Sequence, residues 1–458
     1  MFSTLNIGAS ALFATQRAVE TASHNIANAT VDGYSRQRVE MTSATPSPGT
    51  LGARSDGMRG NGVVVTDVTR LHDQLADVAV RSELTADGYA EARSTTLDRA
   101  QSVLGPVWDG APAKLDALFA SFNNLANNPT DPAARDAVLS AGQEVSRSLN
   151  DASQQLSDIT SASASKVSGD VDRLNQLTAQ VANLNQGVID ARASGQAPND
   201  LLDSRDRAID ELHKLAGVTI HENALGVIDV YAGTKSLVRD NESFALQAGQ
   251  TPGTGVPTVA FADGSSASVG GEIGGYIAVT TIDLPAVRAS LDAVARGLAT
   301  AVNAQHSVGT GLDGSTGNAF FSGTDAATLA VSPSLVPAKI AASAGGAAND
   351  GNNALALFRV STNTTAVTLP GGAPTSIGDA LRALGGRLGS LASGAAAVAK
   401  TTSTAVDSAT KTRSSQNGVS IDEEMVDLVK YQHAYSAAAK VVSTADQMLD
   451  TLINRLGV

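Results

Sequence analysis

Six histidines are the residues of this sequence best suited to bind a metal ion or to transfer a proton, and they lie far apart. They are His24, His72, His213, His221, His306 and His433. A helical zinc site of the HExxH type needs two histidines four residues apart, and no two of these have that spacing. The chain contains no cysteine, which excludes disulfides, thiolate ligands and cysteine nucleophiles. We therefore predict no metal site.

Three further motifs could carry chemistry, but their contexts do not support it. They are Gly309, Gly311 and Gly314 (GxGxxG), Ser163–Lys166 (SxxK) and the acidic run Asp422–Glu424. A dinucleotide-binding GxGxxG follows a strand and opens a helix, whereas these glycines follow a predicted helix. The SxxK run has no supporting motif, and the acidic run stands at a predicted helix start, where it complements the helix dipole. We predict no catalytic residues, no cofactor and no enzymatic activity.

Composition narrows the remaining function classes. The chain has 458 residues, of which 42% are hydrophobic and only 3% aromatic, and its net charge is −13. This charge argues against nucleic acid as a partner, since such binding needs basic residues to neutralise phosphates. No apolar run reaches the roughly 18 residues that would span a membrane. The first residues also lack the basic start and apolar run of a signal peptide.

Both ends of the chain are predicted to be helices with a narrow apolar seam. Within each helix the seam residues are seven positions apart, and Met425 lies between two of them. They are Leu5, Leu12, Val19 and Ile26 in the first helix, and Ile421, Met425, Leu428, Tyr435, Val442, Leu449 and Leu456 in the last. This repeat is typical of a coiled coil. Gln16 and Ser23 interrupt the first seam, so that helix buries little by itself. We predict that both ends become ordered only against neighbouring copies, although a helix pair within one chain fits the pattern too.

The segment between the ends changes from helical to β-type periodicity and back. Helical patterns occupy 70–104, 114–127, 131–193, 203–215, 284–306 and 377–415, while β-type runs occupy 218–220, 226–231, 236–238 and 256–282. The fold class expected is multidomain α+β. Its predicted parts are a terminal coiled-coil assembly domain (1–35 and 416–458), a helix-rich stem (36–216 and 284–415, with a mixed segment at 311–375) and an inserted β-rich outer domain (217–283).

The end of the N-terminal helix carries a family signal. Residues 23–37 read Ser-His-Asn-Ile-Ala-Asn-Ala-Thr-Val-Asp-Gly-Tyr-Ser-Arg-Gln. This resembles the signature of the flagellar axial proteins, in which a helix ends in Asn-Ile-Ala-Asn and a loop leads to a Gly-aromatic pair. The Tyr-Ser-Arg-Gln continuation and the internal Asn303-Ala304-Gln305-His306 with Phe320-Phe321 are similar to the hook–filament junction members of that family. Residues 419–438 resemble its terminal helix.

The resemblance implies a structural subunit of the extracellular flagellum. It implies a homo-oligomeric ring between the hook protein and a second junction protein, export through the flagellar secretion channel, and a dedicated chaperone on the C-terminal helix. The seam residues would be subunit contacts, and Asn25, Asn28, Gly33 and Tyr34 would form the turn that joins the terminal helix to the stem. Two alternatives remain: another rod, hook or junction subunit, and a secreted glycan-binding adhesin.

Overall fold

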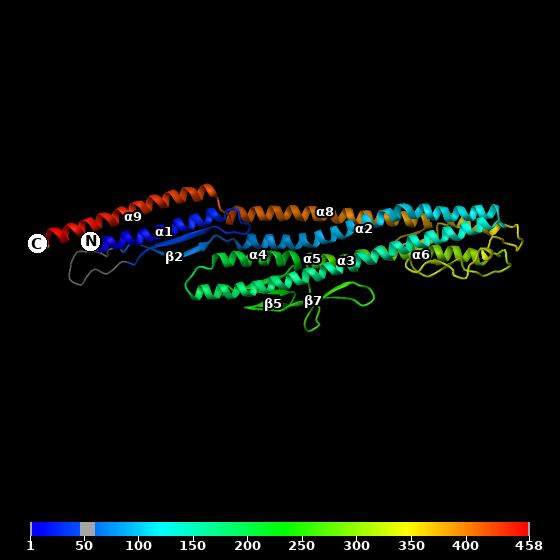
Figure 1. Cartoon of the computed structure of the whole chain (residues 1–458), viewed down its shortest axis with the longest axis horizontal. Coiled ribbons are helices and arrows are strands. Elements are labelled where there is room, and N and C mark those ends of the chain that lie inside the picture. The colour runs from blue at the N-terminus through cyan, green and yellow to red at the C-terminus, as the bar shows by residue number, and fades with distance from the viewer. Residues whose placement is uncertain (1, 46–59, 457–458) are drawn as a thin grey trace. The chain divides into compact units, whose positions relative to one another are not determined.

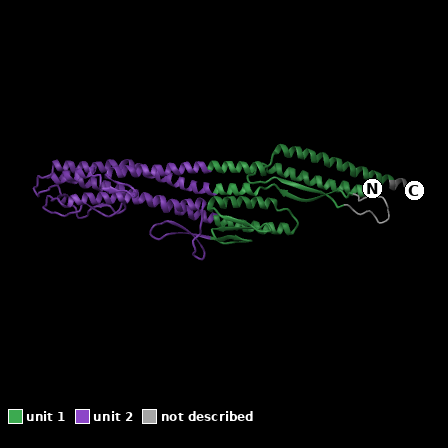
Figure 2. Ribbon diagram, turned by 180° about the vertical axis from the view of Figure 1, so that it is seen from behind, with its two compact units in different colours: residues 1–84, 174–245, 403–458 green, residues 85–173, 246–402 purple. Residues whose placement is uncertain are grey.

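The computed structural model describes residues 2–45 and 60–456, with side chains for 3–45 and 60–451. The chain forms two compact units (Figure 2), which we call unit 1 (1–84, 174–245 and 403–458) and unit 2 (85–173 and 246–402). Helices dominate, and short antiparallel strands accompany them (Figure 1). The predicted mixture of helix and strand is confirmed in this coarse form. None of the described helices combines the length and apolar character needed to cross a membrane.

Long helices make up most of the chain. The α-helices are α1 (Phe2–Asn28), α2 (Gln74–Asn127), α3 (Pro132–Ala193), α4 (Asn199–Ala216), α5 (Gly271–Ala278), α6 (Leu284–Ser307), α7 (Asn352–Arg359), α8 (Ile377–Asn417) and α9 (Ile421–Leu456). The prediction of a break between 104 and 114 is wrong, because α2 continues through Pro106 and Pro112. A proline inside a helix removes one backbone hydrogen bond. Burial of Leu104, Trp108 and Leu115 offsets that loss.

Unit 1 contains a hairpin that the sequence did not reveal. Strands β1 (Gln37–Ser43) and β2 (Val63–Arg70) pair antiparallel, with Gln37 opposite Arg70 and Ser43 opposite Val63. Both strands pack against α1. Polar residues and an irregular register at Glu40 and Met41 mask the period-two pattern that a strand normally shows.

A second sheet of unit 1 packs on α3. Strands β3 (Thr219–Glu222), β4 (Ile228–Ala232), β5 (Lys235–Arg239) and β6 (Glu242–Ser243) follow one another in sheet order. The buried Asn185 of α3 donates from Nδ2 to the carbonyls of Ile228 (2.8 Å) and Asp240 (2.7 Å). These bonds satisfy backbone groups at the strand ends and fix the sheet on the helix.

A β-rich domain over the whole of 217–283 is not confirmed. The next hairpin, β7 (Leu246–Gln250) with β8 (Pro257–Phe261), belongs to unit 2. The prediction of β structure up to Ile282 is wrong, because α5 and a π-helix (Val279–Asp283) occupy 271–283. The glycines there suggested turns, but they allow close helix packing. A Cβ on Gly275 would lie only 2.5 Å from the backbone oxygen of Tyr89.

The core of unit 2 is formed by α2, α3, α6 and α8 with the loops after α6. Fully buried members include Leu97, Phe122, Leu149, Leu291, Phe320 and Leu384. The remaining short elements are β9 (Phe321–Ser322), β10 (Ala330–Val331), a 3-10 turn (Pro337–Lys339), another (Val360–Thr362), β11 (Val367–Thr368) and β12 (Pro374–Thr375). Phe320 makes edge-on ring contacts with Phe122 at 5.4 Å and with His306 at 5.6 Å.

The Asn-x-Gln-His motif at the end of α6 ties these loops to the helix. Asn303 accepts from the amides of Phe320 and Phe321 and donates to the carbonyl of Phe321. The fully buried His306 has Nδ1 2.7 Å from the carbonyl of Asn318, while Nε2 accepts from the amide of Ala341 at 3.1 Å. These partners require a neutral imidazole with its hydrogen on Nδ1. Burial lowers the pKa of His306 below its ordinary value.

Replacing His306 by leucine is expected to destabilise unit 2 and to change its response to acid. At pH 7.5 we expect a loss of about 2 kcal/mol, because two backbone groups lose their partner. A lowered folded pKa means that stability falls as pH drops through about 6.5, where only the unfolded chain takes the proton. Calorimetry between pH 5 and 8 should show this fall to be weaker in His306→Leu. The exposed His221, changed to glutamine, is the control; equal slopes in wild type and His306→Leu would contradict the assignment.

Candidate functional site: the terminal helix pair and its polar base

The two terminal helices pack against each other within unit 1, with small residues at their contact (Figure 1). Gly8, Ala14, Ala18 and Ala22 are buried on α1, as are Ala438 and Ala445 on α9. A Cβ on Gly8 would lie 2.8 Å from Cγ2 of Val442. Small side chains thus allow the helices to approach closely. We call α1 and α9 the terminal helix pair.

This packing corrects the prediction that the ends find burial only against neighbouring copies. Most seam residues, Leu5, Leu12, Val19, Ile26, Leu428, Val442 and Leu449, are half-buried. Ile421, Met425 and Tyr435 are exposed, and the side chain of Leu456 lies outside the described residues. The prediction missed the β1–β2 hairpin, which packs on α1 as α9 does. The residues of α1 that are buried are small ones, not those of the leucine seam.

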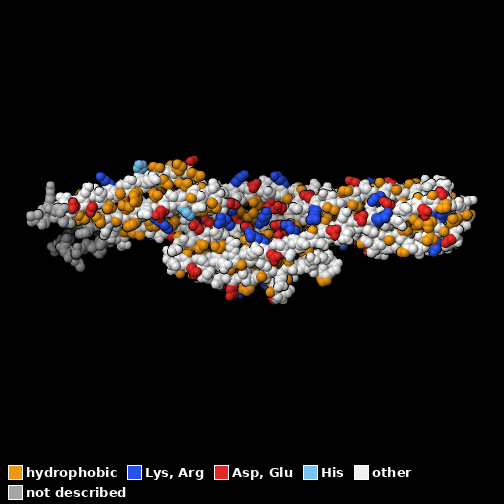
Figure 3. Space-filling model, in the orientation of Figure 1, with side chains coloured by type: hydrophobic (Ala, Val, Ile, Leu, Met, Phe, Trp, Pro, Cys, Tyr) orange, Lys and Arg blue, Asp and Glu red, His pale blue; other side chains and the backbone are white. Residues whose placement is uncertain are grey.

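Large apolar side chains remain exposed on the outer surface of α9. They are Ile421 (45% exposed), Met425 (56%), Val426 (69%), Val429 (49%), Tyr435 (39%), Val441 (43%) and Met448 (53%). In Figure 3 hydrophobic side chains gather over this helix. A group of large exposed apolar side chains on one helix is typical of an interaction site. We call this set the outer face of α9.

Asn25 is the centre of a polar network at the base of the terminal helix pair. Its side chain is 1% exposed. Nδ2 donates to the carbonyl of Gln37 (2.8 Å) and to Oε2 of Glu424 (3.0 Å), while Oδ1 accepts from the Tyr34 hydroxyl (2.8 Å) and the Gln37 amide (3.0 Å). One side chain therefore joins α1, β1 and α9.

Arg36 connects the same base to the start of α9. Its guanidinium lies 2.6 Å from the buried Glu424, 2.9 Å from Glu423 and 3.6 Å from Asp427. Its backbone amide donates to the carbonyl of Asn417, the last residue of α8. The acidic run at the start of α9 therefore has a structural role besides the helix dipole, because it holds this arginine.

The predicted turn residues lie together at the end of α1. Asn28 is the last residue of the helix, and its Nδ2 donates to the carbonyl of His24. Gly33 has a φ of 72°, and a Cβ there would lie 2.6 Å from Cγ of Arg207, so this position requires glycine. Burial, with Asp200, Asp203 and Glu424 nearby, raises the pKa of Tyr34 above its ordinary value, so its hydroxyl stays protonated and donates.

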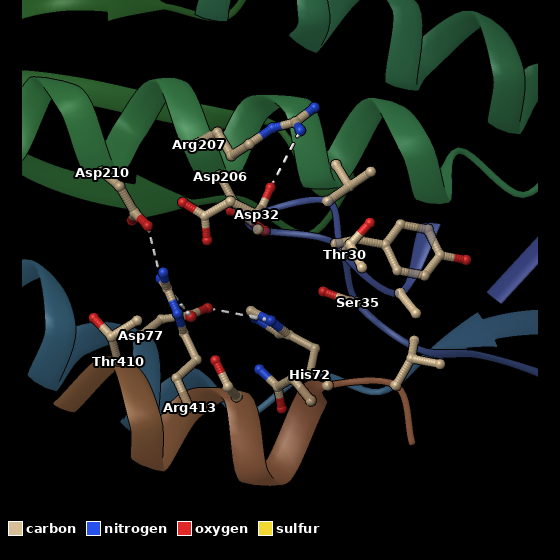
Figure 4. A pocket seen from close by; sticks show the side chains of 18 residues that line it. Thr30, Asp32, Ser35, His72, Asp77, Asp206, Arg207, Asp210, Thr410 and Arg413 are labelled. Atoms are coloured by element: carbon tan, nitrogen blue, oxygen red, sulfur yellow. Dashed lines mark hydrogen bonds and ion pairs between the residues drawn. The ribbon is translucent and has the colours of Figure 1, made fainter. Parts of the chain in front are cut away.

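A buried charge network beneath the turn was not predicted at all; Figure 4 shows Asp77, Asp206, Asp210 and Arg413 of it. It consists of Arg70, Arg81 and Arg413 with Asp77, Asp203, Asp206 and Asp210. We call it the base network. Its closest contacts are Arg70 with Asp206 and Arg413 with Asp210, both at 2.6 Å. Burial alone would raise the pKa of Asp206, but Arg70 and Arg81 outweigh it and lower that pKa. No short-range sequence pattern predicts a network whose residues come from three separate helices and one strand.

The cavity beside this network does not have the arrangement of a catalytic centre. It has a volume of about 350 Å³ and is lined by the 29–35 loop, α2, α4 and the end of α8. Among the described residues, His72, Asp77 and Asp206 have potential metal-ligand atoms within 4.8 Å of one another. Both oxygens of Asp206 are already paired with guanidinium groups. The geometry is that of a structural ion-pair network.

Family models match three parts of the chain. Residues 87–321 match the family described as "Flagellar hook-associated protein FlgK helical domain". Residues 5–34 match "Flagella basal body rod protein", and residues 413–456 match "Flagellar basal body rod FlgEFG protein C-terminal". The two rod-type matches fall on the terminal helix pair.

Whole-chain comparisons agree with these matches. The chain is 30% identical to flagellar hook-associated protein 1 of Bacillus subtilis over 100% of its own length and 99% of the relative's. It is 31% identical to the Escherichia coli protein of the same name, covering 70% of this chain and 60% of that one. The solved flagellar hook junction protein FlgK from Burkholderia pseudomallei shares the fold, with a TM-score of 0.63 at 19% identity, covering 74% of this chain and 100% of that one. The chain therefore belongs to the flagellar hook-associated protein 1 family, whose members are structural proteins of the flagellum.

Proposed function

We propose that this protein forms the hook–filament junction of the flagellum as a ring of identical subunits that pack through their terminal helix pairs. The outer face of α9 supports this proposal most directly. Seven large apolar side chains there are between 39% and 69% exposed in the single chain. Their burial against neighbouring copies would stabilise the ring, at roughly 25 cal/mol for each Å² of apolar surface removed from water.

The polar network around Asn25 and Arg36 gives the terminal helix pair a defined orientation before assembly. Asn25 and Arg36 hold the end of α1, the hairpin and the start of α9 together through buried hydrogen bonds and ion pairs. A pre-organised element loses less conformational entropy when it binds. The predicted turn of Asn25, Asn28, Gly33 and Tyr34 is thus the part that fixes how the pair presents its outer face.

The proposal extends to the finer partners that the family resemblance implies. One side of the ring would contact the hook protein and the other a second junction protein. The subunit would reach the extracellular flagellum through the flagellar export channel. A dedicated chaperone would cover the outer face of α9 before export, since exposed apolar surface favours premature association.

Deletion of the gene followed by complementation tests the proposed function. The expected result is a cell that retains hooks, lacks filaments and sheds flagellin into the medium, with the full chain restoring filaments. Electron microscopy and an immunoblot of the medium provide the two readouts. Filaments of normal number on the deletion strain would contradict the proposal.

The glycan-binding alternative lacks a supporting observation. Of the aromatic residues available for sugar stacking in the β region, Tyr276 and Phe261 are buried and Tyr231 is half-buried. Phe244 is exposed, but the Arg239 guanidinium lies 6.0 Å from its ring centre. Stacking on a sugar needs an accessible aromatic face, so the junction role is the better supported one.

A further inference from the structure

The dipeptide Asn-Gly occurs twice in the chain, at Asn61–Gly62 and at Asn417–Gly418, and both copies belong to unit 1. Asparagine is a chemically labile residue, and a glycine after it increases the reactivity because no Cβ hinders the backbone amide. The nitrogen of that amide can attack Cγ of the asparagine and close a succinimide ring. Since both sites have the same chemistry, their surroundings decide which of them reacts.

Asn417 is protected by its place at the end of α8. It is 7% exposed, and its carbonyl accepts from the Arg36 amide at 2.9 Å. The amide of Gly418, which would be the attacking group, donates to the carbonyl of Ser414, also at 2.9 Å. Ring closure at this site therefore requires the helix end and its bond to Arg36 to open first.

Asn61 has the opposite surroundings. It is exposed just before β2, and its Nδ2 donates to the carbonyl of Thr45 at 3.3 Å. This distance is longer than the usual range for such a bond, so the side chain is only weakly held. The glycine that follows is required by the fold, because Gly62 has a φ of 91° and a Cβ there would overlap Oγ of Ser10. The labile pair is therefore retained at an accessible position.

We propose that Asn61 is a site of spontaneous conversion to isoaspartate, and that this modification loosens the attachment of the β1–β2 hairpin to α1. The Gly62 nitrogen forms a bond to Cγ of Asn61, while the bond from Cγ to Nδ2 breaks and ammonia leaves with the amide proton. Water then opens the succinimide. Hydrolysis of the new bond gives aspartate, whereas hydrolysis of the original peptide bond gives isoaspartate, in which the chain continues through Cγ.

The backbone at Gly62 is the place where β2 begins to contact α1. The Val63 amide donates to Oγ of Ser10 at 3.3 Å, and the Gly62 carbonyl accepts from the Ala44 amide at 2.9 Å. A Cβ on Gly62 would lie 3.2 Å from Cα of Ile7. Isoaspartate lengthens the backbone immediately before these contacts and adds a carboxylate. Both changes displace a segment that is already closely packed on the helix.

Peptide mapping of the full-length chain, incubated at pH 8, tests the proposed site. In urea the two Asn-Gly pairs should convert at similar rates, because neither is then protected. In the folded chain we expect Asn61 to convert at least about tenfold faster than Asn417, because the helix end must open before the second site can react. Electron-transfer fragmentation of the peptides distinguishes isoaspartate from aspartate and locates it.

Hydrogen exchange on the aged chain tests the effect on the hairpin. The amides of Val63 and Ala44 should lose protection by about three- to tenfold, as expected when one hydrogen bond is lost. Asn61→Gln, aged in the same way, is the matched control. Its side chain keeps the amide but would have to close a larger ring, so it should show neither the modification nor the loss of protection.

Two kinds of result would overturn the inference. Equal conversion of Asn61 and Asn417 in the folded chain, or no conversion at Asn61, would show that the fold does not direct this chemistry. Conversion at Asn61 that leaves Val63 and Ala44 as protected as in Asn61→Gln would rule out its effect on the hairpin. Because both measurements use the free chain, either result leaves the filament-assembly test of the proposed function unaffected.

Discussion

Cells whose only copy of this protein carries Val429→Asp should be non-motile and lack filaments, although the variant subunit folds normally. Val429 lies on the outer face of α9 and is 49% exposed in the single chain. The substitution should therefore change the free energy of unfolding by no more than about 0.5 kcal/mol. In a ring, the same position would place an uncompensated carboxylate in an apolar contact, at a cost of several kcal/mol for each subunit.

A valine elsewhere provides the matched control for this variant. Val398 lies on α8 in unit 2 and is 54% exposed, so Val398→Asp changes the same side chain at the same level of exposure outside the terminal helix pair. Swimming-plate assays and filament counts should distinguish the two variants, while circular dichroism of both purified chains confirms folding. Normal filaments on Val429→Asp cells would remove the outer face of α9 from the assembly contact. Leu428→Asp is less informative, because Leu428 is half-buried within the pair.

The parts of the fold that were predictable are those with a local signal. Seven-residue spacing identified both terminal helices, and the segment around Asn25 and Tyr34 carried the family resemblance. Gly33, expected to belong to the turn after the first helix, lies there with a positive φ. Each of these properties depends on residues within one element or one turn, where periodicity and backbone sterics determine the outcome.

The parts that were missed depend on contacts between distant segments. The buried face of α1 consists of Ala14, Ala18 and Ala22 instead of the leucine seam, and both α9 and the β1–β2 hairpin pack on this helix. Arg81 and Arg413 were ordinary helix charges in the sequence, yet the fold brings both to Asp210. Burial of a charge is decided by tertiary packing, so the base network could not be deduced from spacing.

Asn25→Ala should loosen the base of the terminal helix pair far more than the same change at Asn28, although both residues belong to one Asn-Ile-Ala-Asn run. Asn25 makes four hydrogen bonds at 1% exposure. Its loss leaves the backbone of Gln37 and one oxygen of Glu424 without a partner, and leaves the Tyr34 hydroxyl with only Nδ1 of His24, at 3.0 Å. Stranded buried polar groups cost about 1–3 kcal/mol each, so we expect a local loss of about 3 kcal/mol after relaxation.

Asn28 is the internal reference because it makes one local bond, to the carbonyl of His24, and is half-buried. Alanine there should cost less than about 1 kcal/mol, since alanine's higher helix propensity offsets the lost bond. Native-state hydrogen exchange at the amides of α1 measures both losses directly. If the base orients the pair for assembly, Asn25→Ala should also reduce filament number while Asn28→Ala does not. Equal protection in the two variants would show that the family signature specifies only a helix end, and that orientation of the pair comes from Arg36 and the acidic start of α9.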